Sequence, residues 1–299
     1  MKITIAGSLG NIGKPLTKKL REAGHQVTVI SHTEKRRTDI EALGAKAAIG
    51  SVNDAGFLRS AFAGADAVYI MVPPNPGAEN VLHYMNQAGE AFAKAIKEAG
   101  ISRVVMLSSI GADVPSGTGP ISGLYAVEQL FNKIDGLSIT FLRAGFFYTN
   151  FYNDVPVIKA MNVLGNNFPG DLTLLLVHPE DIAAAAAEEL ELRSGGKRVR
   201  YIVSDLKTPA EAAGILGGAI GKPELPWVEF TDEQALHGIK QAGLPDEMAR
   251  LYVEMGQGFR NGLVTKHFLE SGAEVQGKIK LEEFAKEFAE QFSEARMTS

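Results

Sequence analysis

The sequence contains no cysteine, which excludes disulfide bonds, thiolate metal sites and cysteine nucleophiles. Its six histidines are scattered without a pair at ligand spacing, so we expect no metal site. Positive charge is also in deficit. The net charge of −5 gives no reason to expect nucleic acid or an anionic membrane as a partner. No apolar run approaches the ~20 residues of a membrane span, and the opening MKITIAG is too short for a signal-peptide core. We therefore expect a cytoplasmic protein.

The first 150 residues alternate short β-branched runs with amphipathic helical patterns. Strands are expected at Lys2–Ala6, Gln26–Ile30, Ala47–Ile49, Ala67–Met71, Val104–Leu107 and Ser138–Leu142. Helices are expected between them at Lys14–Ala23, Asp54–Ala61, Asn80–Ala99 and Tyr125–Asp135. Strand, helix and strand at this spacing are typical of βαβ units. The sequence thus predicts an α/β protein with a Rossmann-type, doubly wound parallel sheet.

The second half of the chain has a different character. Expected helices lie at Pro179–Glu189, Pro209–Ile220, Asp232–Ala242, Asp246–Gly256 and Leu281–Phe292. We expect residues 1–150 to form the dinucleotide-binding domain and residues 151–299 a smaller, mainly helical, substrate-binding lobe. Two later strands, at Thr173–Val177 and Val199–Val203, are expected to return to the first sheet. Both a monomer and a homodimer fit this organisation.

Three glycines follow the first strand directly and precede the first helix. They are Gly7, Gly10 and Gly13, and each has a mechanical reason. The first permits the tight turn, the second lets backbone approach a pyrophosphate, and the third lets helix pack on strand. The helix N-terminus then offers free N–H groups to phosphate. We expect the whole turn to bind the cofactor: Gly7, Ser8, Leu9, Gly10, Asn11, Ile12 and Gly13.

The spacing of these glycines, Gly-x-x-Gly-x-x-Gly, is that of atypical short-chain dehydrogenases/reductases. Other stretches sharpen the resemblance: Gly50-Ser-Val-Asn-Asp54, Phe62-Ala-Gly-Ala-Asp66, Val104-Val-Met-Leu-Ser108-Ser109, Arg143-Ala-Gly-Phe-Phe-Tyr-Thr-Asn150 and His178-Pro-Glu-Asp181. Together they resemble the NmrA-like branch, densest before residue 185 and loosest after 205. That branch includes NADPH quinone reductases, triphenylmethane and azo-dye reductases, and catalytically silent redox sensors. The resemblance implies a Rossmann fold and a nicotinamide cofactor.

The end of the second strand indicates which dinucleotide is bound. An acidic residue there would favour NAD, and basic residues favour the 2′-phosphate of NADP. Ser31 and His32 carry no negative charge, and Lys35, Arg36 and Arg37 follow within a loop's reach. We therefore expect NADP(H), with NAD(H) as the alternative, and assign phosphate contacts to Ser31, His32 and Arg36. Relatives often have arginine where Ser31 stands, and Glu34 opposes a phosphate unless it pairs with the basic run.

Ligands of parallel α/β sheets bind beyond the carboxyl ends of the strands. Val72, Pro73 and Ser108 lie there and are expected to contact the cofactor. An aromatic segment follows the sixth strand and is expected to form a wall for a flat, conjugated substrate: Phe147, Tyr148, Phe151 and Tyr152. The alternative is that these rings fill the core between the lobes.

Typical short-chain dehydrogenases use Tyr-x-x-x-Lys, in which lysine lowers the tyrosine pKa for proton transfer. Tyr125 is followed four residues later by Gln129, which carries no charge. Tyr125 is thus a candidate proton donor, and helix-start packing is its alternative role. Without the lysine, ketone–alcohol interconversion lacks its relay.

Reduction of quinones, whose reduced oxyanions take protons from solvent, remains feasible. We expect an NADPH-dependent reductase of a small aromatic or quinone-like acceptor such as a quinone or dye. The alternatives are a non-catalytic NADP(H)-sensing regulator acting through protein partners, and a carbonyl or enone reductase using Tyr125.

Overall fold

The computed structural model describes residues 1–73, 75–192 and 195–297. Its centre is a seven-stranded sheet in the order β10-β6-β5-β4-β1-β2-β3, and all neighbouring strands run parallel. The strands are β1 (Lys2–Ala6), β2 (Gln26–Ser31), β3 (Lys46–Ile49), β4 (Ala67–Ile70), β5 (Arg103–Ser109), β6 (Ser138–Ala144) and β10 (Lys197–Ile202). Strand order reverses between β1 and β4, as in a doubly wound Rossmann sheet. The predicted fold class is confirmed.

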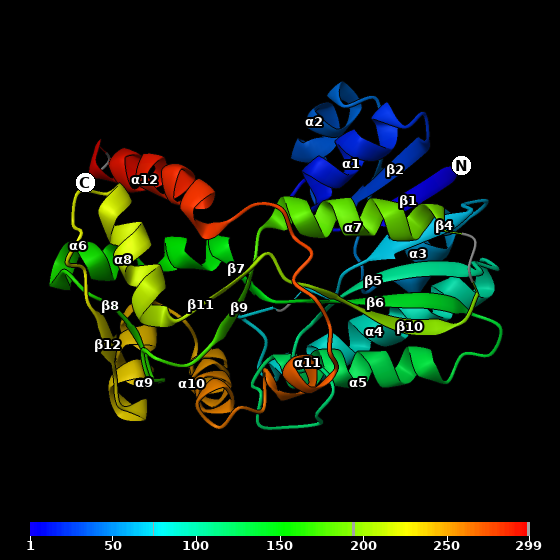
Figure 1. Cartoon of the computed structure of the whole chain (residues 1–299). Coiled ribbons are helices and arrows are strands. Elements are labelled where there is room, and N and C mark those ends of the chain that lie inside the picture. Colours follow the sequence, from blue (N-terminus) through cyan, green and yellow to red (C-terminus); the bar gives the residue numbers. More distant parts are fainter. Residues whose placement is uncertain (74, 193–194, 298–299) are drawn as a thin grey trace.

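Helices cover both faces of this sheet (Figure 1). One face carries α1 (Gly13–Glu22), α2 (Arg37–Ala42) and α7 (Pro179–Glu191), whose apolar residues share a core with β1 and β2. The other carries α3 (Ala55–Phe62), α4 (Val81–Glu98) and α5 (Ile121–Asn132). Strands buried on both sides explain the near-continuous apolar runs in the sequence.

The two later strands behave differently from each other. β10 pairs with β6 from Lys197 opposite Ile139 to Ile202 opposite Ala144, so this return to the first sheet is confirmed. The expectation that Thr173–Val177 also joins that sheet is wrong. β10 already fills the free edge of β6, and β9 (Leu174–Val177) instead pairs with β7 (Phe146–Phe147) and β11 (Asp205–Lys207). All four β9 residues are buried, so the strand builds the core next to the first sheet.

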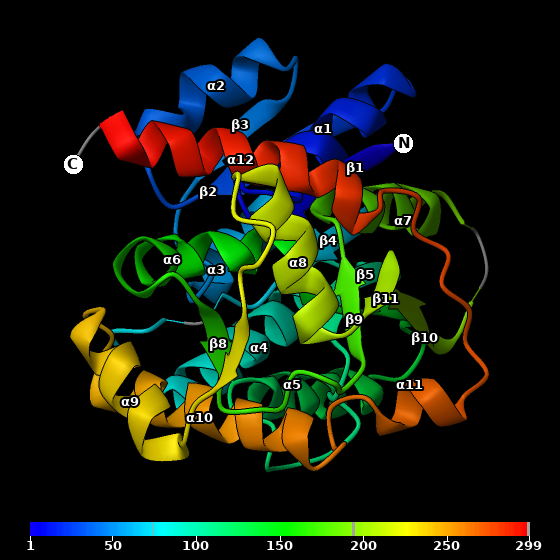
Figure 2. The same cartoon turned by 60° about the vertical axis from the view of Figure 1, so that its left-hand side comes forward.

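The remaining elements form a second, mainly helical region beyond the carboxyl ends of β5 and β6 (Figure 1). They are η2 (Tyr148–Asp154), α6 (Val155–Met161), β8 (Leu164–Asn166), α8 (Pro209–Ala219), β12 (Trp227–Glu229), α9 (Asp232–Gln241), α10 (Asp246–Arg260), α11 (Lys266–Glu270) and α12 (Leu281–Met297). α12 packs against α8 (Figure 2). Within the described ranges, no helix has the length and apolarity needed to traverse a bilayer.

Asp232, the first residue of α9, ties this region together. Its carboxylate accepts hydrogen bonds from Asn167 Nδ2 at 2.8 Å, Gln257 Nε2 at 2.8 Å and the Arg260 guanidinium at 3.1 Å. The hydrogen bond from Arg260, and after it that from Asn167, lowers the pKa of Asp232 to about 2. The carboxylate therefore joins α9 to α10 and to the segment after β8 in its ionised form.

Replacing Asp232 by Asn should lower the free energy of unfolding by about 1–2 kcal/mol at neutral pH, because hydrogen bonds to a charged group are lost. The folded-state pKa lies below the unfolded value of about 4, so this stabilisation is present above pH ~4 and disappears toward pH 2. Thermal denaturation of wild type and variant across this pH range measures it. The matched control is Asp246→Asn, because Asp246 also begins a helix but is exposed and forms a surface ion pair with Lys240. A pH-independent difference for Asp232→Asn would contradict the assignment.

Candidate functional site

The glycine turn joins β1 to α1 and is fixed by close backbone contacts. Gly7 has φ +143°, a conformation that favours glycine, and a Cβ on Gly13 would lie 2.0 Å from the carbonyl oxygen of Ser8. The Ser8 N–H donates to Ile30 O at 3.0 Å, which anchors the turn on the end of β2. Gly7 and Gly13 are therefore required by the shape of the turn itself.

Gly10 is different because a side chain there would find room. The residue is exposed, and among the described residues a Cβ there would meet Gly7 O alone within 4 Å, at an ordinary 3.6 Å. Among the described residues no side chain caps the N-terminus of α1, and its first turn has no acidic residue. Lys14 N already donates to Gly10 O at 3.1 Å and Pro15 has no N–H, so this end offers an anion the Gly13 N–H and the helix dipole. The geometry fits the pyrophosphate of a dinucleotide.

The other predicted turn residues differ in where their side chains lie. Ile12 is buried in the core against α1 and β1, and Leu9 packs at the edge of that core. Asn11 is exposed and Ser8 is half-buried. The Ser8 hydroxyl donates to Ser31 Oγ at 3.1 Å, so the turn and the tip of β2 form one continuous polar surface.

At the tip of β2, positive charge is available and the nearby carboxylate is occupied. Glu34 forms an ion pair with Arg37, and that hydrogen bond holds the pKa of Glu34 below its ordinary value. His32, Lys35 and Arg36 are exposed, and Arg36 contacts Asp39 at 3.4 Å in a solvent-exposed pair. Such a pair contributes little and can exchange its partner for a phosphate. Ser31, in contrast, is only 2% exposed, so its hydroxyl reaches a ligand only at the bottom of this surface.

A cavity of about 280 Å³ lies at the carboxyl ends of β4, β5 and β6, where the second region covers the sheet. Met71 joins it to the glycine turn, because a Cβ on Gly7 would lie 3.0 Å from Met71 Cγ. The predicted residues Val72 and Ser108 line the cavity, whereas Pro73 does not. Its other lining is mostly apolar: Met85, Leu107, Ile110, Ile121, Leu124, Phe146, Phe147, Leu175, Met255, Phe259 and Val264, among others.

The predicted aromatic wall is only partly in this lining. Phe147 lines the cavity, together with Phe146 and Phe259, which the sequence did not single out. Of the other three predicted rings, Tyr148 and Phe151 lie in the core of the second region, and Tyr152 is partly buried against that core. The reason is local: a 3₁₀ helix begins at Tyr148, so Tyr148 and Phe151, three residues apart, share one side, which here is buried. The Tyr148 hydroxyl donates to Ile279 O at 3.1 Å, and its ring stacks on Phe284 at 5.3 Å.

Tyr125 also lies outside the cavity lining. It is half-buried on α5, and its hydroxyl makes no hydrogen bond to any residue that the structure describes. The polar residue of α5 that acts near the cavity is Glu128, which contacts the lining residue Ser108. Ser108 Oγ donates to Glu128 Oε1 at 2.5 Å.

Glu128 is 1% exposed and forms a buried ion pair with Arg143 on β6. Arg143 Nη2 lies 2.7 Å from Oε2 and Nε lies 3.1 Å from Oε1. Burial disfavours the charged guanidinium, but its hydrogen bond and attraction to Glu128 outweigh this and raise the pKa of Arg143. The sequence signal for this pair was a charged residue inside each of two otherwise apolar segments, an arrangement that requires partners.

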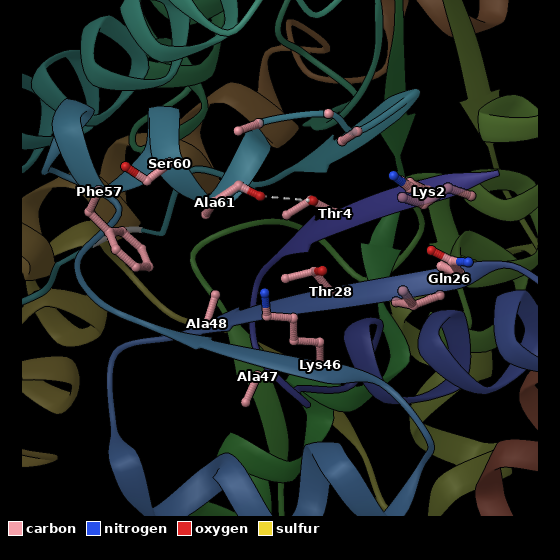
Figure 3. Close-up of a pocket in the computed structure, with 15 residues that line it drawn as sticks. Lys2, Thr4, Gln26, Thr28, Lys46, Ala47, Ala48, Phe57, Ser60 and Ala61 are labelled. Carbon is pink, nitrogen blue, oxygen red and sulfur yellow. Dashed lines mark hydrogen bonds between the residues drawn. The ribbon is translucent and has the colours of Figure 1, made fainter.

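A second hollow lies at the amino-terminal half of β1, β2 and β3, beside α3 (Figure 3). Lys2, Thr4, Thr28 and Lys46 face it, and the Thr4 hydroxyl donates to Ala61 O at 3.2 Å. This hollow is at the opposite end of the strands from the glycine turn. Because ligands of doubly wound sheets bind at the carboxyl ends, we place the functional site at the turn and the adjoining cavity.

Comparison with known proteins gives matches over most of the chain. Residues 7–191 match the family of NAD(P)H-binding proteins. An NAD(P)H azoreductase from Xenophilus azovorans is 26% identical over 249 residues, which are 83% of each protein. Among solved structures, an Escherichia coli NADPH-dependent quinone oxidoreductase in complex with NADPH has a TM-score of 0.80 at 20% identity, covering 95% of this chain and 99% of that one. A Citrobacter triphenylmethane reductase with NADP(H) has a TM-score of 0.78 at 20% identity, covering 96% and 99%.

Replacing Gly10 by Val should abolish dinucleotide binding while the fold stays intact, because the new side chain fills space that only a phosphate would need. Titration with NADPH, followed by nicotinamide fluorescence, measures the loss, and circular dichroism checks the fold. Gly13→Val is the contrasting control, since its Cβ would clash with Ser8 O and destabilise the protein as a whole. Undiminished NADPH affinity in Gly10→Val would refute a phosphate site at this turn.

Proposed function

We propose that this chain, which belongs to the NAD(P)H-binding family, is an NADPH-dependent reductase that transfers hydride to a small conjugated acceptor such as a quinone or a dye. The observation that carries the proposal is the apolar, partly aromatic cavity that meets the glycine turn at Met71. A dinucleotide on that turn can extend into the cavity, where Phe146, Phe147 and Phe259 offer faces to a flat ring. The proteins that it resembles are named as reductases of azo compounds, quinones and triphenylmethane dyes, which supports the proposal.

The protein's own residues would bind, orient and desolvate the reactants. The turn from Gly7 to Gly13 would hold the pyrophosphate, and His32, Lys35 and Arg36 would receive the 2′-phosphate of NADPH. The methionines and phenylalanines of the cavity would exclude water and stack on the acceptor. Bound NADPH supplies the hydride, and solvent supplies the proton that completes the reduced acceptor.

The charge left on the acceptor after hydride addition favours an acceptor of this kind. A quinone, one NADPH and one proton give a hydroquinone and NADP⁺. The anion formed by hydride addition is delocalised over the ring, so protonation need not accompany hydride transfer. A ketone would leave a localised alkoxide and requires a positioned acid.

The purified protein should oxidise NADPH in the presence of a quinone such as menadione or a triphenylmethane dye, and should be inactive with aliphatic ketones. The absorbance of reduced nicotinamide is followed, with Gly10→Val as the control that should not turn over. Absence of NADPH oxidation with every quinone and dye, despite measurable NADPH binding, would overturn the proposed reductase function. A protein that binds NADPH and reduces nothing would instead fit a sensor.

Replacing Tyr125 by Phe should reduce turnover on a quinone by less than about tenfold, equivalent to about 1.4 kcal/mol of barrier. Tyr125 lies outside the cavity lining, and Gln129 cannot supply the positive charge that an acidic tyrosine needs. Phe147→Ala serves as the comparison, because loss of a lining ring should raise KM. A thousandfold loss in Tyr125→Phe with NADPH affinity preserved would make Tyr125 the proton donor.

A further inference from the structure

Both serine hydroxyls in the cavity have already committed their hydrogen to the protein. Ser108 Oγ donates to Glu128 Oε1 at 2.5 Å, and Ser109 Oγ donates to Ile110 O at 2.9 Å. A hydroxyl has one hydrogen and two lone pairs. A ligand that reaches either oxygen therefore meets a hydrogen-bond acceptor.

The orientation of Ser108 is fixed by the ion pair behind it. As a carboxylate, Glu128 can only accept hydrogen bonds, and Arg143 donates to both of its oxygens, sharing Oε1 with Ser108. Arg143 is itself held by a further bond to Ala112 O at 3.3 Å. Turning the Ser108 hydrogen toward a ligand would remove one of three donors from a carboxylate that is 1% exposed. Loss of such a hydrogen bond in the interior is costly, so the Ser108 hydroxyl keeps donating its hydrogen to Glu128.

Neighbouring backbone N–H groups of the lining are committed as well. Ile110 N donates to Ala144 O at 2.9 Å, and Gly145 N donates to Ile202 O at 3.0 Å. The polar side chains of the lining that keep a free donor are Thr265, on the side of the second region, and Asn150, which is exposed. In the described lining, the side chains at the end of β5 thus present acceptors.

We propose that Ser108 determines substrate specificity by accepting a hydrogen bond from an O–H or N–H group carried by the acceptor molecule. This rests on the proposed reductase function and narrows its substrate class. The preferred acceptors are conjugated azo or quinone compounds that bear a phenolic hydroxyl or an N–H. Compounds in which that hydrogen is replaced by methyl would leave Ser108 Oγ without a donor from the ligand, and sites built to pair a hydroxyl discriminate against analogues that lack it.

The test compares 4-hydroxyazobenzene with 4-methoxyazobenzene as competitive inhibitors of menadione-dependent NADPH oxidation. This pair differs in the hydroxyl hydrogen, and competition reports binding whether or not the dyes are reduced. Wild type should bind the hydroxy compound about tenfold more tightly. Ser108→Ala should remove this preference by weakening only the hydroxy compound, with both inhibition constants measured against the variant's own menadione-dependent rate. Ser122→Ala is the matched control, because Ser122 is a buried serine of α5 that contacts Thr118 and lies outside the cavity.

Three outcomes would overturn the inference and leave the reductase function standing. The first is equal inhibition by the two dyes, or inhibition by neither, in wild type. The second is a preference that survives in Ser108→Ala. The third is a fall in NADPH affinity in Ser108→Ala, measured by nicotinamide fluorescence, without a change in dye preference; this would make Ser108 a partner of the cofactor. No menadione-dependent oxidation in wild type would instead refute the proposed function itself.

Discussion

The buried ion pair between Arg143 and Glu128 connects the parts of the molecule that must stay in register at the cavity. Arg143 lies on β6 and Glu128 on α5, and through them the pair fixes Ser108 on β5 and the carbonyl of Ala112. On its other side Arg143 Nη1 lies 3.4 Å from the hydroxyl of Tyr201 on β10. A charge pair with almost no exposure is weak evidence for net stability, since an apolar replacement of similar shape can do as well. Its role here is to orient hydrogen bonds, because it fixes the direction in which the Ser108 hydroxyl donates beside the cavity.

The sequence predicted the first sheet closely because its signals are local. Runs of β-branched residues bounded by glycine identify β1, β2, β4, β5 and β6 within three residues at each end. The glycine turn could be predicted for the same reason, since each glycine answers a constraint within a few residues. The prediction that β9 joins the first sheet was wrong because four apolar residues in a row fit any buried strand. The edge of the first sheet beside β6 is taken by β10, and the sequence carries no local signal for that pairing. Short elements such as α6, β8 and β12 carry too few residues for a period to appear.

At the cavity, the sequence predicted that aromatic residues would lie nearby, but not which of their rings would face it. The sequence located an aromatic segment after β6, but the switch from β7 to a 3₁₀ helix at Tyr148 turns Tyr148 and Phe151 into the core and leaves Tyr152 packed against it. Phe259 reaches the lining from α10, more than a hundred residues later, and no local pattern relates it to Phe147. The sequence gives no local signal for the role of Glu128, because its partners Ser108 and Arg143 lie 20 and 15 residues away on β5 and β6.

Gln129, which stands in place of a lysine, and the orientation of the serines have one consequence in common. The Ser108 hydroxyl donates to the buried Glu128 carboxylate and the Ser109 hydroxyl to the Ile110 carbonyl, so neither has a hydrogen left to stabilise a developing alkoxide. Tyr125, the alternative acid on α5, lies outside the lining. Both facts disfavour carbonyl-to-alcohol chemistry, although they arise from different residues. An acceptor that spreads the incoming charge over its own conjugated system avoids the need for a donor at this end of the cavity. If it also carries a hydroxyl or N–H, the same lone pairs that would repel an oxyanion hold it in place.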